Sequence, residues 1–185
     1  FPGLNIHLQT DKEANLLAKI KEGEVDIGLI LDRSTADSFL HRRIIREEPL
    51  VLIAPANHVL SKLEKVTMQD LNNYEFIVSE ESCIYRSLFE NLLKENGIIF
   101  RIGFELSNLE AIKRCVMNGL GIALLPKIVA QEEISRGYLV ELPFVHPEIH
   151  FDLQLLLHPK KWISQPLQLL IQMLMSEAKA EATGN

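Results

Sequence analysis

Apolar residues along this chain switch repeatedly between the two-residue period of a β-strand and the 3.6-residue period of an α-helix. Strands are predicted over residues 4–8, 25–31, 50–54, 76–78, 122–125, 139–142 and 151–157, with one more from residue 40 and another ahead of the helix start at Ser107. Helices are predicted over residues 11–22, 84–96, 108–118, 128–136 and 166–174, and the tail from residue 178 is expected to fray. Strands that alternate with helices in this way predict an α/β fold.

Two helix starts carry the strongest local signals. Ser107 precedes Glu110 by three residues, and Thr10 precedes Glu13 by the same spacing, so each pair is predicted to form a capping box. Glycines at 23 and 119 follow the two helices as left-handed stops. The free N–H groups at such helix starts carry partial positive charge, which favours a small anion nearby.

The two capped segments also resemble one another. TDKEANLLAKIKEGEVDIGLIL and SNLEAIKRCVMNGLGIALLP share a cap, a Glu, an Ala, apolar positions and a terminal Gly. We infer one βαβ unit in each of two Rossmann-like lobes, although chance is a rival explanation because capped helices between strands are common. Lobe I is expected to comprise residues 1–53 plus 152–185 and lobe II residues 54–151, with residues 50–54 and 151–157 as crossover strands and a ligand pocket between the lobes.

Composition narrows the possible functions. The net charge of -6 and the pI near 5.5 argue against a chain that holds nucleic acid by itself. Cys83 and Cys115 have neither metal-ligand nor disulfide spacing, and the histidines form no zinc motif, so no metal and no cofactor are predicted. No apolar run reaches membrane-spanning length, which favours a cytoplasmic protein without a membrane partner. The start at Phe1, without Met, suggests a piece of a longer protein.

Several phrases resemble the effector-binding domain of LysR-type transcriptional regulators. They are FPGLNIHLQ, GEVDIGLI, REEPLVLIAPANHVL and, most specifically, SNLEAIKRCVMNGLGIALLP followed by EEISRGYLVEL. The resemblance covers essentially the whole chain and implies a periplasmic-binding-protein type II-like fold of two lobes joined by two crossover strands. It further implies a small effector, expected to be an anionic carboxylate, a homodimer or homotetramer, and DNA contact only through an amino-terminal winged helix-turn-helix absent from this chain.

The resemblance also places the effector near the helix starts. It implies effector contacts from Thr10 in lobe I and from five residues of lobe II: Ser82, Tyr85, Arg86, Ser107 and Asn108. Arg86, in a Cys-Ile-Tyr-Arg pattern, is suited to clasp a carboxylate with two hydrogen bonds, but it could equally be a solvated surface residue or pair with Glu81 or Glu90. Asp11 would repel an anion and is interpreted as a structural residue of the first helix.

Three other functions compete with effector sensing. A transporter's solute-binding protein would share the fold but work outside the cytoplasm. An enzyme would need a nucleophile, metal or base constellation, and neither Gly-x-Ser-x-Gly nor a phosphate loop occurs, so no enzyme activity is predicted. Redox sensing through Cys83 would need a resolving thiol, and Cys115 is expected in the core instead.

Overall fold

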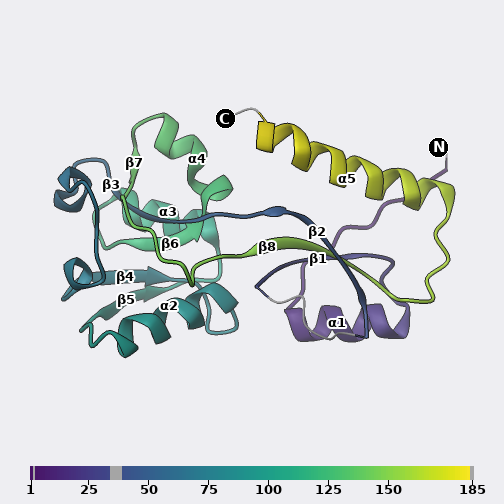
Figure 1. The fold of residues 1–185 in the computed structure, drawn as a ribbon, viewed down its shortest axis with the longest axis horizontal. Helices are drawn as coiled ribbons and strands as arrows, with labels where there is room; N and C mark the ends of the chain where they lie inside the picture. Colours follow the sequence, from purple (N-terminus) through teal and green to yellow (C-terminus); the bar gives the residue numbers. More distant parts are fainter. Residues whose placement is uncertain (2, 34–38, 184–185) are drawn as a thin grey trace. The chain divides into compact units, whose positions relative to one another are not determined.

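The computed structural model describes residues 1, 3–33 and 39–183, and of residues 177–183 the backbone only. The chain is divided into two compact units, and Figure 1 labels their helices and strands. Unit 1 comprises Phe1–Glu47 with Phe151–Asn185, and unit 2 comprises Glu48–His150. The chain therefore passes between the units twice, after residue 47 and after residue 150.

Unit 1 is built on a three-stranded antiparallel sheet. Its strand order is β1 (Gly28–Asp32), β8 (Asp152–Leu157) and β2 (His41–Glu47). Helices α1 (Glu13–Glu22) and α5 (Gln165–Thr183) pack on this sheet through different residues of β8. Leu156 joins the α1 cluster, whereas Leu155 and Leu157 join the α5 cluster, because successive side chains of a strand point to opposite faces.

Unit 2 contains a mixed sheet with both faces covered. Strands β6 (Ala123–Pro126) and β7 (Leu139–Glu141) flank β3 (Leu50–Pro55) antiparallel, while β4 (Glu75–Val78) and β5 (Arg101–Glu105) pair in parallel. Ile122 joins the two groups: its N–H donates to the Glu75 carbonyl at 3.0 Å and its carbonyl accepts from Ile77 N–H at 2.9 Å. The order across the unit is thus β5, β4, β6, β3, β7.

Three helices cover that sheet. Helix α2 (Ile84–Glu95) shares its core cluster with Leu52 and Phe76, and α3 (Leu109–Met117) and α4 (Lys127–Ser135) share theirs with Ile53 and Ile77. Two short 3-10 helices, Val59–Lys62 and Gln69–Leu71, interrupt the connection between β3 and β4.

Gly121 makes the close approach of β6 to β4 possible. A Cβ at this position would lie 2.6 Å from the Glu75 carbonyl oxygen and 3.1 Å from its carbon. Both are backbone atoms, which cannot rotate away as a side chain could. Gly119, with a φ of 77°, takes the left-handed conformation expected after α3.

The strand predicted over residues 4–8 is wrong. Residues 4–10 have no regular secondary structure, and Leu4, Ile6 and Leu8 are exposed. The sheet of unit 1 has no strand from this segment, and an alternating pattern without a hydrogen-bonding neighbour does not make a strand. The predicted repeat of two βαβ units is therefore not present: β1 follows α1 but pairs antiparallel with β8.

The two segments expected as crossover strands, residues 50–54 and 151–157, each pair within one unit. Strand β3 pairs with β6 and β7 of unit 2, and β8 pairs with β1 and β2 of unit 1. The tail expected to fray from residue 178 continues as helix α5 to Thr183.

Candidate functional site

The carboxyl ends of β4 and β5 lie side by side because the two strands are parallel. Leu106 N–H donates to the Val78 carbonyl at 2.9 Å, immediately beyond the last residues of both strands. The loop of residues 79–83 then leads into α2, and Leu106, Ser107 and Asn108 lead into α3. Loops that begin at one edge of a parallel pair and run into helix starts form a common setting for ligand sites.

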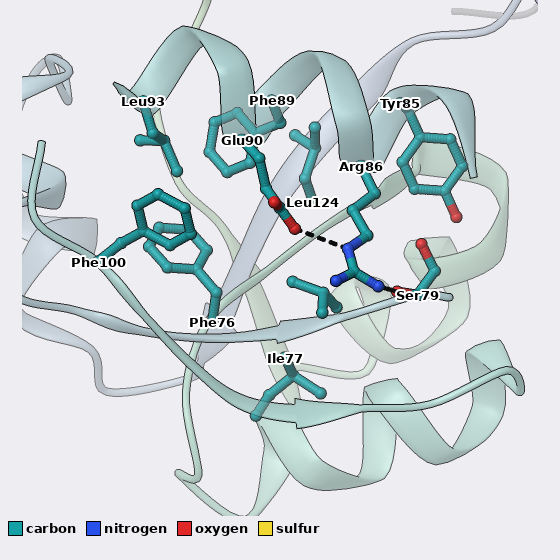
Figure 2. Close-up of a pocket in the computed structure, with 11 residues that line it drawn as sticks. Phe76, Ile77, Ser79, Tyr85, Arg86, Phe89, Glu90, Leu93, Phe100 and Leu124 are labelled. Atoms are coloured by element: carbon teal, nitrogen blue, oxygen red, sulfur yellow. Dashed lines mark hydrogen bonds and ion pairs between the residues drawn. The ribbon is translucent and has the colours of Figure 1, made fainter. Parts of the chain in front are cut away.

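Arg86 lies at this edge with its guanidinium turned into the protein. Its side chain is only 6% exposed. Nε donates to Glu90 at 2.7 Å and Nη1 donates to the Ser79 carbonyl at 2.5 Å, as Figure 2 shows. Nη1 also lies 3.0 Å from a carboxylate oxygen of Glu105, the last residue of β5. One side chain thus connects α2 with the ends of both strands.

The charges around Arg86 compensate one another. Burial by itself would lower the pKa of Arg86, but its contacts with Glu90 and Glu105 outweigh burial and raise that pKa above its ordinary value. Glu90 also lies 3.5 Å from Lys94, so its carboxylate is shared between two cations. Of the two alternatives that the sequence left for an Arg86 ion pair, the structure contains the pair with Glu90.

Ser79 and Tyr85 lie next to Arg86 on the inner side of α2. Both residues are buried, and the Tyr85 hydroxyl faces the Ser79 side chain in Figure 2. Burial above all, together with the neighbouring Cys83, raises the pKa of Tyr85 above its ordinary value. The cavity beneath α2 measures about 20 Å³, enough for a water molecule and too small for a metabolite. It is lined by Phe76, Ile77, Val78, Ser79, Tyr85, Arg86, Phe89, Glu90, Leu93, Phe100 and Leu124.

The cap of α3 is Asn108, and the predicted capping box of Ser107 with Glu110 is wrong. The Asn108 side-chain oxygen accepts from the N–H groups of Glu110 at 2.8 Å and Ala111 at 3.3 Å. The helix therefore begins one residue later than the sequence suggested, and an amide oxygen two or three residues before a free N–H is a good cap. Ser107 is exposed beside this cap and does not take part in it.

The box predicted for Thr10 and Glu13 is also wrong. The cap position of α1 is Lys12, which has no side-chain capping bond, and Thr10 lies exposed two residues earlier. Asp11 instead accepts from Lys12 N–H, from Asn15 and from Lys19, and these bonds, the one from Lys19 above all, lower its pKa to about 2. These contacts agree with the structural role predicted for Asp11.

Ser82 is exposed in the turn ahead of α2, and Cys83 occupies the cap position of that helix without a side-chain capping bond. The structure thus brings Ser82, Tyr85 and Arg86 together on one loop and helix start, with Ser107 and Asn108 on the neighbouring loop of the same unit. Thr10 belongs to unit 1. Among the described residues, no group of His, Cys, Asp or Glu is arranged to hold a metal ion.

A buried lysine fixes the orientation of α3. Lys113, with a side chain 6% exposed, lies 2.8 Å from Glu133 of α4 and 2.7 Å from Glu110 of its own helix. Burial by itself would lower the pKa of Lys113, but its bonds to Glu110 and Glu133 outweigh burial and raise it. The bond to Lys113 in turn lowers the pKa of Glu133. Sequence reasoning did not identify Lys113, although its position next to buried Ile112 and one turn before Met117 places it near the inward face.

Comparison with known proteins identifies the class. The family model described as the LysR substrate binding domain matches residues 1–179. The chain belongs to this family, and its structural neighbours share the periplasmic-binding-protein type II-like fold, which confirms the predicted fold class.

Individual relatives are transcriptional regulators by name. The chain is 34% identical over 155 residues to the uncharacterized HTH-type transcriptional regulator YwqM of Bacillus subtilis, covering 84% of this chain and 52% of that protein. It is 30% identical over 149 residues to the HTH-type transcriptional regulator CbbR of Sinorhizobium medicae, covering 80% of this chain and 47% of the relative. The chain spans about half the length of the curated relatives it matches.

Two solved structures share the fold. The Synechocystis PCC6803 CcmR regulatory domain in complex with 2-PG gives a TM-score of 0.84 at 24% identity, covering 97% of this chain and 86% of that chain. The effector-binding domain of QuiR in complex with shikimate gives a TM-score of 0.73 at 19% identity, covering 92% and 79%. No helix in the described part of this chain is both long and apolar enough to cross a membrane.

Proposed function

We propose that this chain senses a small anionic metabolite for a LysR-type transcriptional regulator. The observation that carries the proposal is the family match over residues 1–179. The proposal is also supported by the relatives named as HTH-type regulators and by the two neighbours solved in complex with 2-PG and with shikimate. Effector binding would change the equilibrium between states of the regulator, and DNA-binding domains elsewhere in that protein would respond to the change.

Arg86 supports an anionic effector. A guanidinium held by Glu90 and the Ser79 carbonyl is fixed in position before any ligand arrives, which reduces the ordering cost of binding. Ser107 is exposed two residues after Glu105, which contacts Arg86, and because Asn108 caps α3, the Ser107 hydroxyl is available to a ligand. We therefore propose Ser82, Tyr85, Arg86, Ser107 and Asn108 as the contribution of unit 2 to effector binding.

Thr10 remains a proposed contact on the side of unit 1. It is exposed, and its hydroxyl is not part of the α1 cap. The variant Thr10→Ala tests this residue separately from those of unit 2. Unchanged effector affinity in this variant would remove Thr10 from the site.

The cellular setting follows from the same proposal. A regulator of this class works in the cytoplasm as a homodimer or homotetramer and catalyses no reaction. It meets DNA through a separate amino-terminal domain. The solute-binding alternative has no relative or neighbour among those described above to support it.

Binding and DNA recognition test the proposal together. Calorimetry of the 185-residue chain against small carboxylates and phosphorylated carboxylates, including 2-PG and shikimate, is expected to find an effector with micromolar to millimolar affinity. The complete regulator should then bind its operator with a different affinity when that effector is present. An effector that binds Arg86→Lys and Ser107→Ala with the same affinity as the wild type would overturn the proposed site. A complete regulator that binds no DNA would overturn the function.

A further inference from the structure

The three acceptors around Arg86 differ in their access to solvent. The Ser79 carbonyl belongs to a buried residue, and the Glu90 side chain is 18% exposed. The Glu105 side chain is 47% exposed and meets the guanidinium at the end of β5. Glu105 is therefore the partner of Arg86 that water and solutes can reach.

The three contacts also differ in how readily they can be exchanged. Breaking a buried charge-assisted hydrogen bond leaves a desolvated group without a partner, whereas the Glu105 carboxylate, on a side chain that is 47% exposed, can be hydrated when it leaves Arg86. The bonds to Glu90 and to the Ser79 carbonyl hold the guanidinium through contacts that do not involve Glu105. A carboxylate at the position of Glu105 is also the chemical group that a guanidinium would recognise in a ligand.

We propose that Glu105 occupies the anion position at Arg86 in the free protein, and that the negatively charged group of the effector displaces it. The inference rests on the proposed function and deepens it by assigning the competing group. Glu105 then weakens the binding of every anion, because the ligand must replace an existing carboxylate and approach its charge. It acts as a specificity-determining residue: only an anion with further contacts, such as those of Ser107, overcomes this competition.

The displacement also has a direct route to the neighbouring loop. Glu105 precedes Ser107 by two residues and lies opposite Val78 in the register of β5 with β4. A change in its contact with Arg86 therefore acts on the segment that leads into α3. The ion pair between Arg86 and Glu105 thus lowers the affinity for the effector, and its breakage on binding changes the conformation of the segment before α3.

Removing the charge of Glu105 tests the proposal with a defined probe. Inorganic phosphate is titrated into the 185-residue chain at constant ionic strength, with binding followed by calorimetry and by thermal unfolding. Glu105→Gln keeps the size and polarity of the side chain but gives up its charge. It should bind phosphate about fivefold more tightly than the wild type, as expected for the removal of one unit charge about 4 Å away and screened by bulk water.

Glu110→Gln is the matched control. Glu110 is another exposed glutamate, near the start of the neighbouring helix, with a side chain 68% exposed, but it pairs with Lys113 and not with Arg86. A gain confined to Glu105→Gln supports displacement. An equal gain in Glu110→Gln would reduce the effect to general charge and overturn the proposal.

The double variant Glu105→Gln with Arg86→Met assigns the gain to the guanidinium. The gain should disappear in it, and thermal unfolding without phosphate checks that each variant folds. No gain in Glu105→Gln, or a gain that persists without Arg86, would overturn the proposal. The proposed effector class can fail separately. If Glu105→Gln binds phosphate more tightly but none of the carboxylates tested by calorimetry binds, the displacement stands and the proposed effector class is wrong.

Discussion

The Glu90 carboxylate accepts a hydrogen bond from Nε of Arg86 at 2.7 Å, one helical turn away on α2. This pair is part of the packing beneath the helix as well as of the candidate site. We expect Arg86→Met to lower the free energy of unfolding by about 2 to 4 kcal/mol, because Glu90 and the Ser79 carbonyl lose a buried donor. Urea denaturation of the variant and the wild type measures the difference.

Lys94→Met provides the control for that prediction. Lys94 contacts the same Glu90 carboxylate at 3.5 Å, but its side chain is 61% exposed. Its replacement should change stability by less than about 0.5 kcal/mol, as is usual for an exposed ion pair. If Arg86→Met and Lys94→Met lost the same free energy of unfolding, the burial of Arg86 would contribute nothing to stability.

The cap of α3 predicts opposite results for two adjacent residues. Asn108→Ala should lower the free energy of unfolding by about 1 kcal/mol, because the N–H groups of Glu110 and Ala111 lose their acceptor. Ser107→Ala should leave stability nearly unchanged, since Ser107 does not cap the helix. Chemical denaturation of both variants decides between Asn108 and Ser107 as the cap, and a larger loss in Ser107→Ala would contradict the structure.

Gly121→Ala should destabilise unit 2 by about 1 to 3 kcal/mol, the usual cost of forcing extra volume into a packed site. The added methyl group would meet backbone atoms of Glu75 at 2.6 Å and 3.1 Å. Gly103→Ala in β5 is the comparison, because the nearest atom to its added carbon is 3.5 Å away. The difference in melting temperature between the two variants is the readout, and equal melting temperatures would count against the close approach of β6 to β4.

The pair of Lys113 and Glu133 predicts a dependence of stability on acid pH. The folded protein holds the pKa of Glu133 below its ordinary value of 4.5, so at acid pH the unfolded chain binds more protons than the folded one. This contribution is complete above pH 4.5 and is lost as the pH falls through the lowered value. Glu133→Gln should therefore flatten the loss of stability below pH 4.5, as followed by urea denaturation at several pH values.

Glu132→Gln is the matched variant for the acid experiment. Glu132 precedes Glu133 on α4 and pairs with Arg136, but both of these side chains are more than 60% exposed. This variant should lose stability below pH 4.5 as the wild type does, because exposed ion pairs contribute little to stability. A flattened profile in this variant as well would show that the Lys113 pair is not the source.

Most helices and strands could be predicted from the sequence because their apolar residues either follow the period of the element or, in a strand buried on both faces, form an unbroken run. In β3, Val51 and Ile53 face one helix layer while Leu52 and Ala54 face the other, so the apolar run is continuous and recognisable. The strand expected at residues 4–8 has the right alternation but no partner, and pairing is a property of the whole fold. Local pattern therefore identifies candidate strands and cannot supply their neighbours.

The candidate site was harder to predict than the fold. Ser107 and Asn108 both fit a cap, and only the backbone conformation at residue 108 decides between them. For Arg86 the signal was present, because Phe89 and Leu93 follow at helical spacing and place it on the buried face of α2. Its contact with Glu105 joins residues far apart in sequence, and such a pair depends on the parallel alignment of β4 and β5.

That alignment leaves β5 bonded along one edge only. In the described structure its neighbour is β4, whereas β4 is bonded to β5 on one side and to Ile122 on the other. Amide protons of β5 that point away from β4 are consequently expected to exchange with solvent deuterium faster than the amide protons of β4. Hydrogen–deuterium exchange measured by mass spectrometry can therefore follow the strand next to Arg86, with the β4 amides as the slowly exchanging reference.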